Sequence, residues 1–330
     1  MRLPRRRARQ QGAALLAAMI VVALVAALAA AALWRQWRGV EVESAERARV
    51  QSSWLLTGAL DWGRLILAGD LRESSTDHLS EPWAMPLAEA RLSTFLAAGE
   101  SSAGADRDAF LSGQITDLQS RLNVMNLVAG DGQQAKARFQ RLFQQLGLPA
   151  SELEALSRNL ERANAAMQSN NTGANAADAP LLPRRYGQLA WLGVAPETLE
   201  ALRPYVTVLP VSTAITPVNL NTASALAIEA ALLIDLADAQ RLVAARDRSP
   251  FKNTQDAAAL LNSQPDLTWA SVQSSYFEIR GRLRLDDMVL QEVAVVRRFN
   301  DPNRRGVITL WRERESIAAP LAAAAYNRPE

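Results

Sequence analysis

The residues that could carry out chemistry in this chain are few and scattered. There is one histidine, His78, and there is no cysteine, so metal–thiolate sites, disulfides and cysteine nucleophiles are excluded. A lone histidine without clustered carboxylates is most often a loop or packing residue. The sequence contains no nucleophile–base motif and no phosphate-cradling glycine loop. We therefore expect a protein that is not an enzyme.

The stretch that most invites a chemical interpretation is 218–261, which begins V-N-L-N-T-A-S-A-L-A-I-E. It resembles the helix-hairpin-helix unit of DNA-binding proteins, in which N-x-N-T-A, here Asn219, Asn221 and Thr222, opens the first helix. We predict that Thr222 or Asn221 caps this helix, that Phe251 fills the core, and that Thr254 caps a later helix.

The hairpin of this unit lacks the features that bind phosphate. DNA binding by such a unit depends on a glycine turn whose backbone N–H groups meet phosphate. Here the turn, 232–238, reads L-L-I-D-L-A-D, with two acids and no glycine. We therefore expect the fold without the phosphate binding, and no nucleic-acid partner. A membrane-tethered DNA-binding or uptake protein remains the alternative.

Basic charge is concentrated at the start of the chain. The pI is about 9.3, yet the first 12 residues hold five arginines and no acid, and without them the formal charge of +2 becomes −3. Long-range attraction of the body to a polyanion is therefore not expected.

A membrane-spanning helix is predicted directly after the arginines. Ala13–Leu33 has 21 residues without a charge, which at about 1.5 Å per residue covers about 30 Å, the thickness of a bilayer core. A cleavable signal peptide is the competing interpretation, but its apolar region would be shorter, roughly 7 to 15 residues. The run ends at an aromatic and basic interface anchor formed by Trp34, Arg35, Trp37 and Arg38. The arginines should keep the amino end cytoplasmic and place the rest of the chain across the membrane.

The same helix is predicted to continue beyond the membrane. No proline lies between Pro4 and Pro82, so one helix from Ala13 to about Gly69 would be about 85 Å long. Its apolar face is predicted to contain Ala48, Leu55, Ala59, Trp62 and Ile66.

The remaining sequence predicts an α+β fold. Residues 71–113 form a loop-rich connection with short strands, and 133–262 are mostly helical with a low-complexity loop at 164–180. Leu146-Gly147-Leu148 and its following helix recur as Leu192-Gly193-Val194 at an offset of 46, which indicates a duplicated helical hairpin. Alternation at 277–285 and a turn at 300–306 predict antiparallel strands. The predicted segments are a leader (1–12), a membrane helix (13–34), a first body part (35–118), an inserted helical domain (119–265), and carboxyl-terminal strands with a disordered tail (266–330).

The amino terminus resembles that of type IV pilin-like proteins. In that family a prepilin peptidase cuts on the cytoplasmic side after a glycine, here between Gly12 and Ala13, and leaves the hydrophobic helix in place. Most family members carry a glutamate five residues into the mature chain, which meets the amino terminus of the subunit above; the matching residue here is Ala17. A buried carboxylate without a partner is costly, so Ala17 indicates a subunit with nothing above it, or a protein outside any filament.

Three further motifs, taken in order with this start, are similar to the minor pseudopilin K family of the type II secretion system. They are H-L-S-E-P-W-A-M-P (78–86), D-L-Q-S-R-L-N-V-M-N-L (117–127) and T-P-V-N-L-N-T-A (216–223). The resemblance implies a pilin-like body, with a long amino-terminal helix packed on an antiparallel sheet, and an inserted helical domain with helix-hairpin-helix or SAM-like repeats.

The resemblance also implies a function and partners. The protein would cap a pseudopilus tip with minor pseudopilins I and J and support export of folded proteins across the outer membrane. It would meet other pseudopilins, the prepilin peptidase and the inner-membrane secretion platform. It would be a single-pass inner-membrane protein with its body in the periplasm. An uncut bitopic scaffold is the further alternative.

A calcium site of the family is not expected to carry over. Relatives often show D-W-x-D-x-D followed by G-x-E before the second helical repeat, whereas the corresponding region here has Asp178 as its only aspartate. Hard cations need several convergent oxygens, so we expect no cofactor.

Overall fold

The structure is a computed structural model that describes residues 11–91, 109–130, 132–168, 178–285, 288–301 and 304–318. The chain divides into two units, Met1–Leu55 and Leu56–Glu330. Most of the leader and the carboxyl-terminal tail, for which disorder is predicted, lie outside the described residues.

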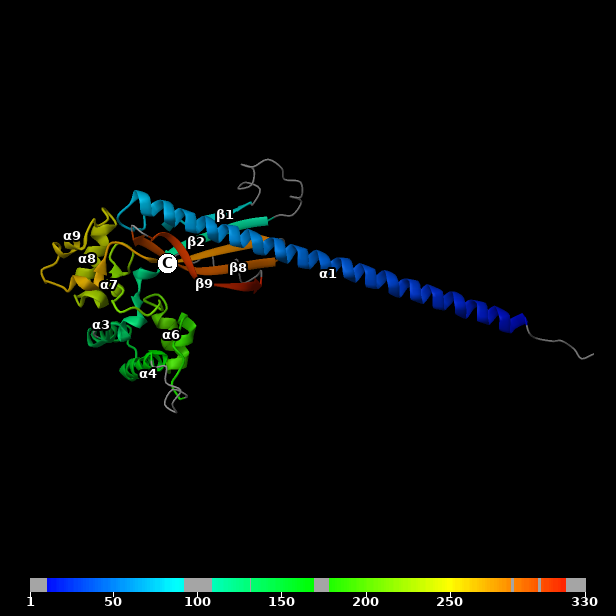
Figure 1. Ribbon diagram of the computed structural model, residues 1–330, viewed down its shortest axis with the longest axis horizontal. Coiled ribbons are helices and arrows are strands. Elements are labelled where there is room, and N and C mark those ends of the chain that lie inside the picture. Colours follow the sequence, from blue (N-terminus) through cyan, green and yellow to red (C-terminus); the bar gives the residue numbers. More distant parts are fainter. Residues whose placement is uncertain are drawn as a thin grey trace, which may run out of the picture. The chain divides into compact units, whose positions relative to one another are not determined.

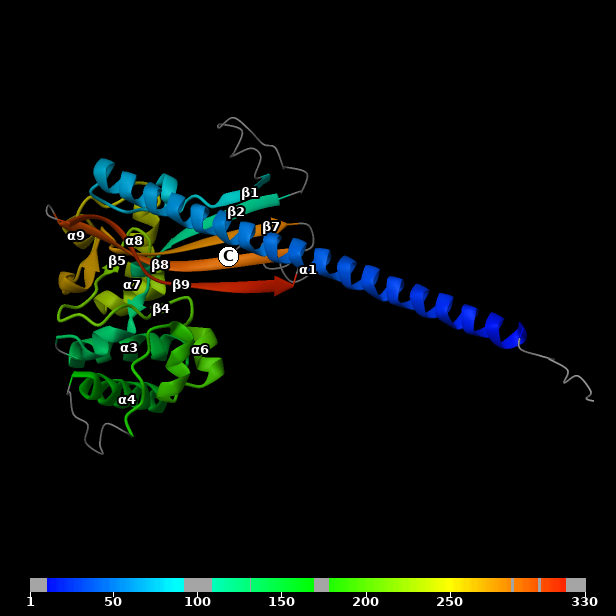
Figure 2. The same cartoon turned by 45° about the vertical axis from the view of Figure 1, so that its right-hand side comes forward.

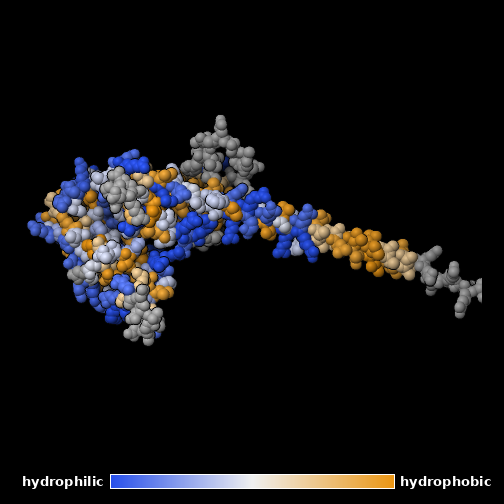
Figure 3. All heavy atoms as spheres, in the orientation of Figure 1, coloured by the Kyte–Doolittle hydropathy of each residue, from blue (hydrophilic) through white to orange (hydrophobic). Residues whose placement is uncertain are grey.

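The first unit consists of the beginning of helix α1 (Gln11–Glu73). Its uncharged stretch shows apolar side chains on every side, because large residues such as Leu16, Val22 and Leu28 are all more than half exposed. Figure 3 shows this stretch as a continuous apolar surface. A helix that is apolar all round is suited to lipid or to a buried position. The predicted end near Gly69 is four residues short of the observed end.

The second unit contains a five-stranded antiparallel sheet with the order β1-β2-β7-β8-β9 (Figure 2). The strands are β1 (Leu87–Arg91), β2 (Ala109–Asp117), β7 (Tyr276–Leu285), β8 (Met288–Asp301) and β9 (Arg304–Ala318). The alternation predicted at 277–285 is confirmed, since Phe277, Ile279 and Leu283 are buried. The predicted hairpin is β8–β9, which pairs in antiparallel register.

The last turns of α1, from Leu56 onward, pack on this sheet. The core between them contains Leu60 and Leu67 of the helix, Trp83 of η1 (Pro82–Ala84), and Phe277 and Ile279 of β7. The predicted apolar face of the helix is wrong here by one position: the buried residues are Leu56, Leu60, Gly63 and Leu67, whereas Trp62 is 46% exposed. Apolar residues occupy adjacent positions along this helix, so the apolar stripe is wide and the pattern alone does not fix which edge faces the sheet.

Glycines set how closely the helix approaches the sheet. A Cβ atom at Gly63 would lie 2.8 Å from Cγ2 of Ile279, and one at Gly281 would lie 3.6 Å from Leu56. The missing Cβ at Gly63 makes room for the Ile279 side chain, so that α1 can lie close to β7.

We call the segment between β2 and β7 the helical domain. We use the name sheet body for the five-stranded sheet together with η1 and the end of α1. The helices of the helical domain gather at one end of the sheet (Figure 1). Its elements are η2 (Leu118–Ser120), β3 (Leu122–Asn123), η3 (Val124–Val128), α3 (Gly132–Gln145), α4 (Ala150–Gln168), η4 (Tyr186–Leu192), α6 (Pro196–Leu202), β4 (Val206–Thr207), β5 (Val218–Asn219), α7 (Ala225–Leu232), α8 (Leu236–Arg246), α9 (Thr254–Ala258), η5 (Leu267–Trp269) and β6 (Ala270–Ser271). Strands β3 and β4, and β5 and β6, form two short parallel pairs. The largest apolar core of the described residues lies here and includes Phe139, Leu156, Leu192, Ile228 and Phe251. The α+β class is confirmed.

The duplicated hairpin is present but unequal. Gly147 and Gly193 both adopt positive φ (65° and 87°), the left-handed conformation that ends a helix without steric cost in glycine. The first copy joins two α-helices, whereas the second begins with the 3₁₀ helix η4. The predicted loop at 164–180 is partly wrong, because α4 continues to Gln168; residues 169–177 lie outside the described residues.

Strand β9 forms one edge of the sheet and carries charge along its outer positions. Arg312, Glu313 and Arg314 are exposed on it. Arg185 of the helical domain reaches across to this strand, where its guanidinium lies 2.7 Å from Glu313 and 5.0 Å from the ring centroid of Trp311. From the other side, Arg64 of α1 donates a 2.7 Å hydrogen bond to the carbonyl of Val307.

We predict opposite effects for two alanine substitutions on α1. Gly58→Ala, where a Cβ would meet nothing within 4 Å, should raise the free energy of unfolding by about 1 kcal/mol through helix propensity. Gly63→Ala should lower it by about 1–2 kcal/mol, because the Cβ overlaps stiff, branched Ile279. Urea unfolding of the full chain in detergent measures both. Equal stabilisation by the two would contradict the close packing at Gly63.

Candidate functional site

Three segments far apart in the sequence meet in one buried polar network. They are the loop after α1 (residues 74–81), the end of β2 with η2 and η3, and the turn that includes β5. These segments overlap the three motifs 78–86, 117–127 and 216–223 noted in the sequence. We call the network the polar junction. From these segments it contains Asp77, Glu81, Asp117, Asn219 and Thr222, and it is completed by Asp70 of α1, Ser274 before β7 and Arg298 of β8.

Asp117 at the end of β2 is the centre of the polar junction. Its Oδ2 accepts hydrogen bonds from the hydroxyls of Ser274 and Thr222, both at 2.6 Å, and from Nδ2 of Asn219 at 3.1 Å. Its Oδ1 accepts from the backbone N–H of Gln119 at 2.7 Å. Asp117 as a whole is 2% exposed. Burial raises the pKa of Asp117 to about 6, against the opposing effect of its hydroxyl and backbone donors.

Asn219 connects the helical domain to two parts of the sheet body. Its Nδ2 also lies 3.1 Å from the carbonyl of Asp77 and 3.0 Å from the hydroxyl of Ser274. Its Oδ1 accepts from the backbone N–H of Asn221. The side chain is fully buried, so each of these polar groups depends on the others for its hydrogen bonds.

A second set of bonds extends the junction along 117–127. Asn126 and the backbone of Thr216 exchange two hydrogen bonds of 2.9 Å. Asn123 donates to the hydroxyl of Thr216, and Gln119 donates to the carbonyl of Pro217 at 3.0 Å. The two motifs are therefore held in register by side-chain amides, which both donate and accept.

Arg298 of β8 supplies the positive charge of the junction. Its side chain is 4% exposed and donates to Asp70 at 2.7 Å, to both oxygens of Asp77, and to the carbonyl of Ser274. Its guanidinium also lies 4.7 Å from the ring centroid of Phe277. The last turn of α1 is thereby attached to the loop that follows it.

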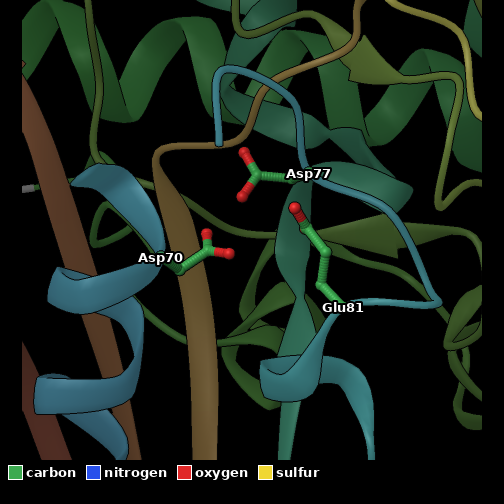
Figure 4. Close-up of side chains that lie close together, drawn as sticks. All are labelled: Asp70, Asp77 and Glu81. Carbon is green, nitrogen blue, oxygen red and sulfur yellow. The ribbon is translucent and has the colours of Figure 1, made fainter. Parts of the chain in front are cut away.

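Carboxyls outnumber cations in the polar junction. Asp70, Asp77 and Glu81 point toward one another (Figure 4) and each offers an oxygen within 4.8 Å of the others. Burial raises the pKa of Asp70 to about 6, with a further contribution from nearby Glu81, and burial also raises the pKa of Asp77. Oxygens in such a group are suitable ligands for a hard cation. Here Arg298 already donates to two of the three, so the cluster has its own internal cation.

Glu81 links this group to the core. Its Oε2 accepts from the indole N–H of Trp83 at 2.7 Å and from the backbone N–H of His78 at 2.9 Å. Trp83 in turn packs edge-on against Phe277, with ring centroids 5.2 Å apart. His78 lies in the loop, as expected, with Nε2 3.8 Å from Glu81.

The predicted helix caps are wrong in position. Ser224 caps α7 by accepting from the N–H of Ala227, and Asn253 caps α9. Thr222 and Asn221 are used in long-range bonds instead: Thr222 donates to Asp117, and Asn221 exchanges two 2.9 Å bonds with the backbone of Phe251. Phe251 is buried in the core, as predicted.

The helical hairpin α7–α8 turns without glycine. Leu233 adopts φ 54°, the only non-glycine residue with positive φ in the described part of the chain, and Asp235 caps α8. An acidic cap occupies the helix N-terminus that a phosphate would need.

The predicted residues of the amino terminus all lie on α1. Gly12 and Ala13 are in its first turn, and Ala17 is exposed. At the predicted interface anchor, Trp34 and Trp37 are 59% and 64% exposed, and the guanidinium of Arg38 lies 5.6 Å from the ring of Trp34. Among the described residues, α1 is the one helix long and apolar enough to cross a membrane, which fits a single-pass membrane anchor.

Sequence reasoning missed Asp70, Asp77, Ser274 and Arg298. Asp70 and Asp77 are separated from Arg298 by more than 220 residues, so no local spacing reveals them. The one local signal for the polar junction was Asp117, the acidic residue at the start of the motif 117–127.

Comparisons with known proteins agree on one family. Residues 120–211 and 218–280 match two segments described as "Type II secretion system (T2SS), protein K". The type II secretion system protein K of Pseudomonas aeruginosa is 26% identical over 282 residues, covering 78% of this chain and 80% of that protein.

A solved structure has the same fold. It is the crystal structure of the GspK-GspI-GspJ complex from the type 2 secretion system of enterotoxigenic Escherichia coli, with a TM-score of 0.58 and 18% identity, covering 82% of this chain and 98% of that one. The alternative of a DNA-binding protein finds no support in these matches. The two matched segments span the helical domain, including the turn that carries Asn219. The Pseudomonas relative extends the likeness over most of the chain. The protein therefore belongs to the type II secretion system protein K family and is a minor pseudopilin.

Proposed function

We propose that this minor pseudopilin is the tip subunit of a type II secretion pseudopilus and supports export of folded proteins across the outer membrane. It is held in the inner membrane by the first part of α1, with its amino end in the cytoplasm and its body in the periplasm. The observation that carries this proposal is the 21-residue uncharged stretch of α1, preceded by arginines and followed by Trp34, Arg35, Trp37 and Arg38.

Processing between Gly12 and Ala13 would prepare the subunit for assembly. Removal of the 12-residue leader takes away five arginines and leaves a helix whose first charged side chain is Arg35. Such a helix can leave the bilayer lengthwise more easily, because the five arginine side chains no longer have to cross the hydrocarbon and only the new amino terminus of Ala13 remains charged at that end.

The tip position is supported by two features. Ala17 lacks the carboxylate that would pair with a subunit above. The helical domain is joined to the sheet body beside Asp70 and Asp77, at the carboxyl end of α1. If that end leads as the filament leaves the membrane, the helical domain would obstruct any further subunit.

Minor pseudopilins I and J are the proposed partners at the tip, because the solved structure of the same fold is a complex of K with I and J. The prepilin peptidase, other pseudopilins and the inner-membrane secretion platform would act earlier, during processing and assembly. The role is structural and not enzymatic: the buried carboxyls of the polar junction are used in bonds to other side chains.

We predict that Gly12→Leu blocks processing, because a bulky residue replaces the glycine at the cleavage site. Intact mass of the membrane-extracted protein, co-expressed with a prepilin peptidase, should then retain the leader, whereas wild type should be shorter by 12 residues. Gly39→Leu on the same helix, at a site with nothing within 4 Å of the added Cβ, serves as control and should be cut. An uncut wild type with an active peptidase would contradict the proposal.

We predict that Ala17→Glu is cut normally but lowers secretion tenfold or more. At the tip its carboxylate would lack an amino terminus to pair with and would carry a desolvation cost of several kcal/mol. Ala17→Leu, which adds bulk without charge, should secrete as wild type does. Secretion of a reporter cargo, together with crosslinking to I and J, measures the effect. Normal secretion by Ala17→Glu would argue against the tip position while leaving the family unchanged.

A further inference from the structure

The polar junction is the place where the helical domain and the sheet body share buried charge. On the sheet-body side, α1 contributes Asp70, the following loop contributes Asp77, His78 and Glu81, β2 contributes Asp117, and β8 contributes Arg298. The helical domain contributes uncharged Asn219 and Thr222. Arg246 of the same domain donates to the backbone carbonyls of Leu220 and Ala223, which flank Asn221 and Thr222.

Charge in this cluster does not balance once every carboxyl is ionised. Four carboxyls then share the one guanidinium of Arg298, which donates to two of them, Asp70 and Asp77. Like charges within 4.8 Å of each other in a buried setting repel strongly. Protonation of one or two carboxyls removes this repulsion and leaves an ion pair with neutral neighbours.

The hydrogen bonds that this repulsion would strain join the helical domain to the sheet body. The loop of Asp77 is attached to the helical domain by the bond from Asn219 to the Asp77 carbonyl and by the bond from the Asp77 N–H to Val272. Repulsion among Asp70, Asp77 and Glu81 pushes this loop away from α1, and these bonds hold it.

We propose that the polar junction is a pH-responsive latch that holds the helical domain firmly on the sheet body in mild acid and loosens as the pH rises toward neutrality. The direction follows from linkage. A carboxyl whose pKa is higher in the folded chain than in the unfolded chain binds its proton more tightly when folded. Stability is therefore gained as the pH falls from about 7 toward 4, between the folded value of about 6 for Asp70 and Asp117 and the ordinary value of 3.8.

The test compares the full chain in detergent at pH 5.5 and pH 7.5. We expect the melting temperature of wild type to be higher at pH 5.5 by about 3 °C or more. Asp70→Asn, whose amide oxygen can still accept from Arg298, should raise the melting temperature at pH 7.5 and reduce the difference between the two pH values by about half. Glu161→Gln removes an exposed carboxyl on α4 and should leave the difference unchanged.

Hydrogen exchange locates the effect. After correction for the intrinsic pH dependence of exchange, peptides covering 74–81 and 216–222 should exchange faster at pH 7.5 than at pH 5.5 in wild type, and the difference should be about half as large in Asp70→Asn. Asn219→Ala should speed exchange of these peptides at both pH values, because it removes the bonds while leaving the titrating groups. Three results would each overturn the proposal: a wild-type melting temperature that does not depend on pH, an Asp70→Asn variant that keeps the full wild-type difference, or equal exchange of these peptides at the two pH values in wild type.

Discussion

The packing of the second unit depends on a carboxylate that is buried far from water. Asp117 ends β2, where the chain leaves the sheet, and it receives bonds from Thr222 and Asn219 of the helical domain and from Ser274, where the chain returns to the sheet. A buried carboxyl bonded to several side chains fixes their positions relative to one another, because any partner that moves leaves an unsatisfied polar group behind. One side chain thus determines where a domain of more than a hundred residues begins and ends on the sheet.

Arg298 complements this arrangement from the opposite side of the loop. It bonds to α1 through Asp70 and to the loop through Asp77, while its flat face packs on Phe277. The end of the long helix, the sheet and the helical domain therefore meet around two charged side chains of opposite sign. Removing one partner of a buried ion pair of this kind is strongly destabilising, because it leaves an uncompensated charge in the interior.

The sequence predicted those features that follow from periodicity or composition. The uncharged run of α1, the alternation of Phe277, Ile279 and Leu283, and the glycine helix ends at Gly147 and Gly193 all have local causes, and the structure contains them. The roles of Asn221 and Thr222 were mispredicted because an amide or hydroxyl at the start of a helix can cap it or bond to a distant partner, and only the tertiary fold selects between the two. The inner face of α1 was misassigned for a related reason: Gly63 faces the sheet because Ile279 requires the space. The polar junction could not be predicted as a unit, since its members are spread from residue 70 to residue 298.

The position of Arg185 over strand β9 also affects how one copy of the protein can contact another. The edge strand of a sheet has unpaired N–H and C=O groups that can pair with a strand of another molecule, and soluble proteins block such edges. Here a side chain from the neighbouring helical domain lies over Trp311 and pairs with Glu313, with charged residues on either side. Strand-to-strand pairing between copies along β9 is thus discouraged, because an approaching strand would have to displace Arg185 from Trp311 and Glu313.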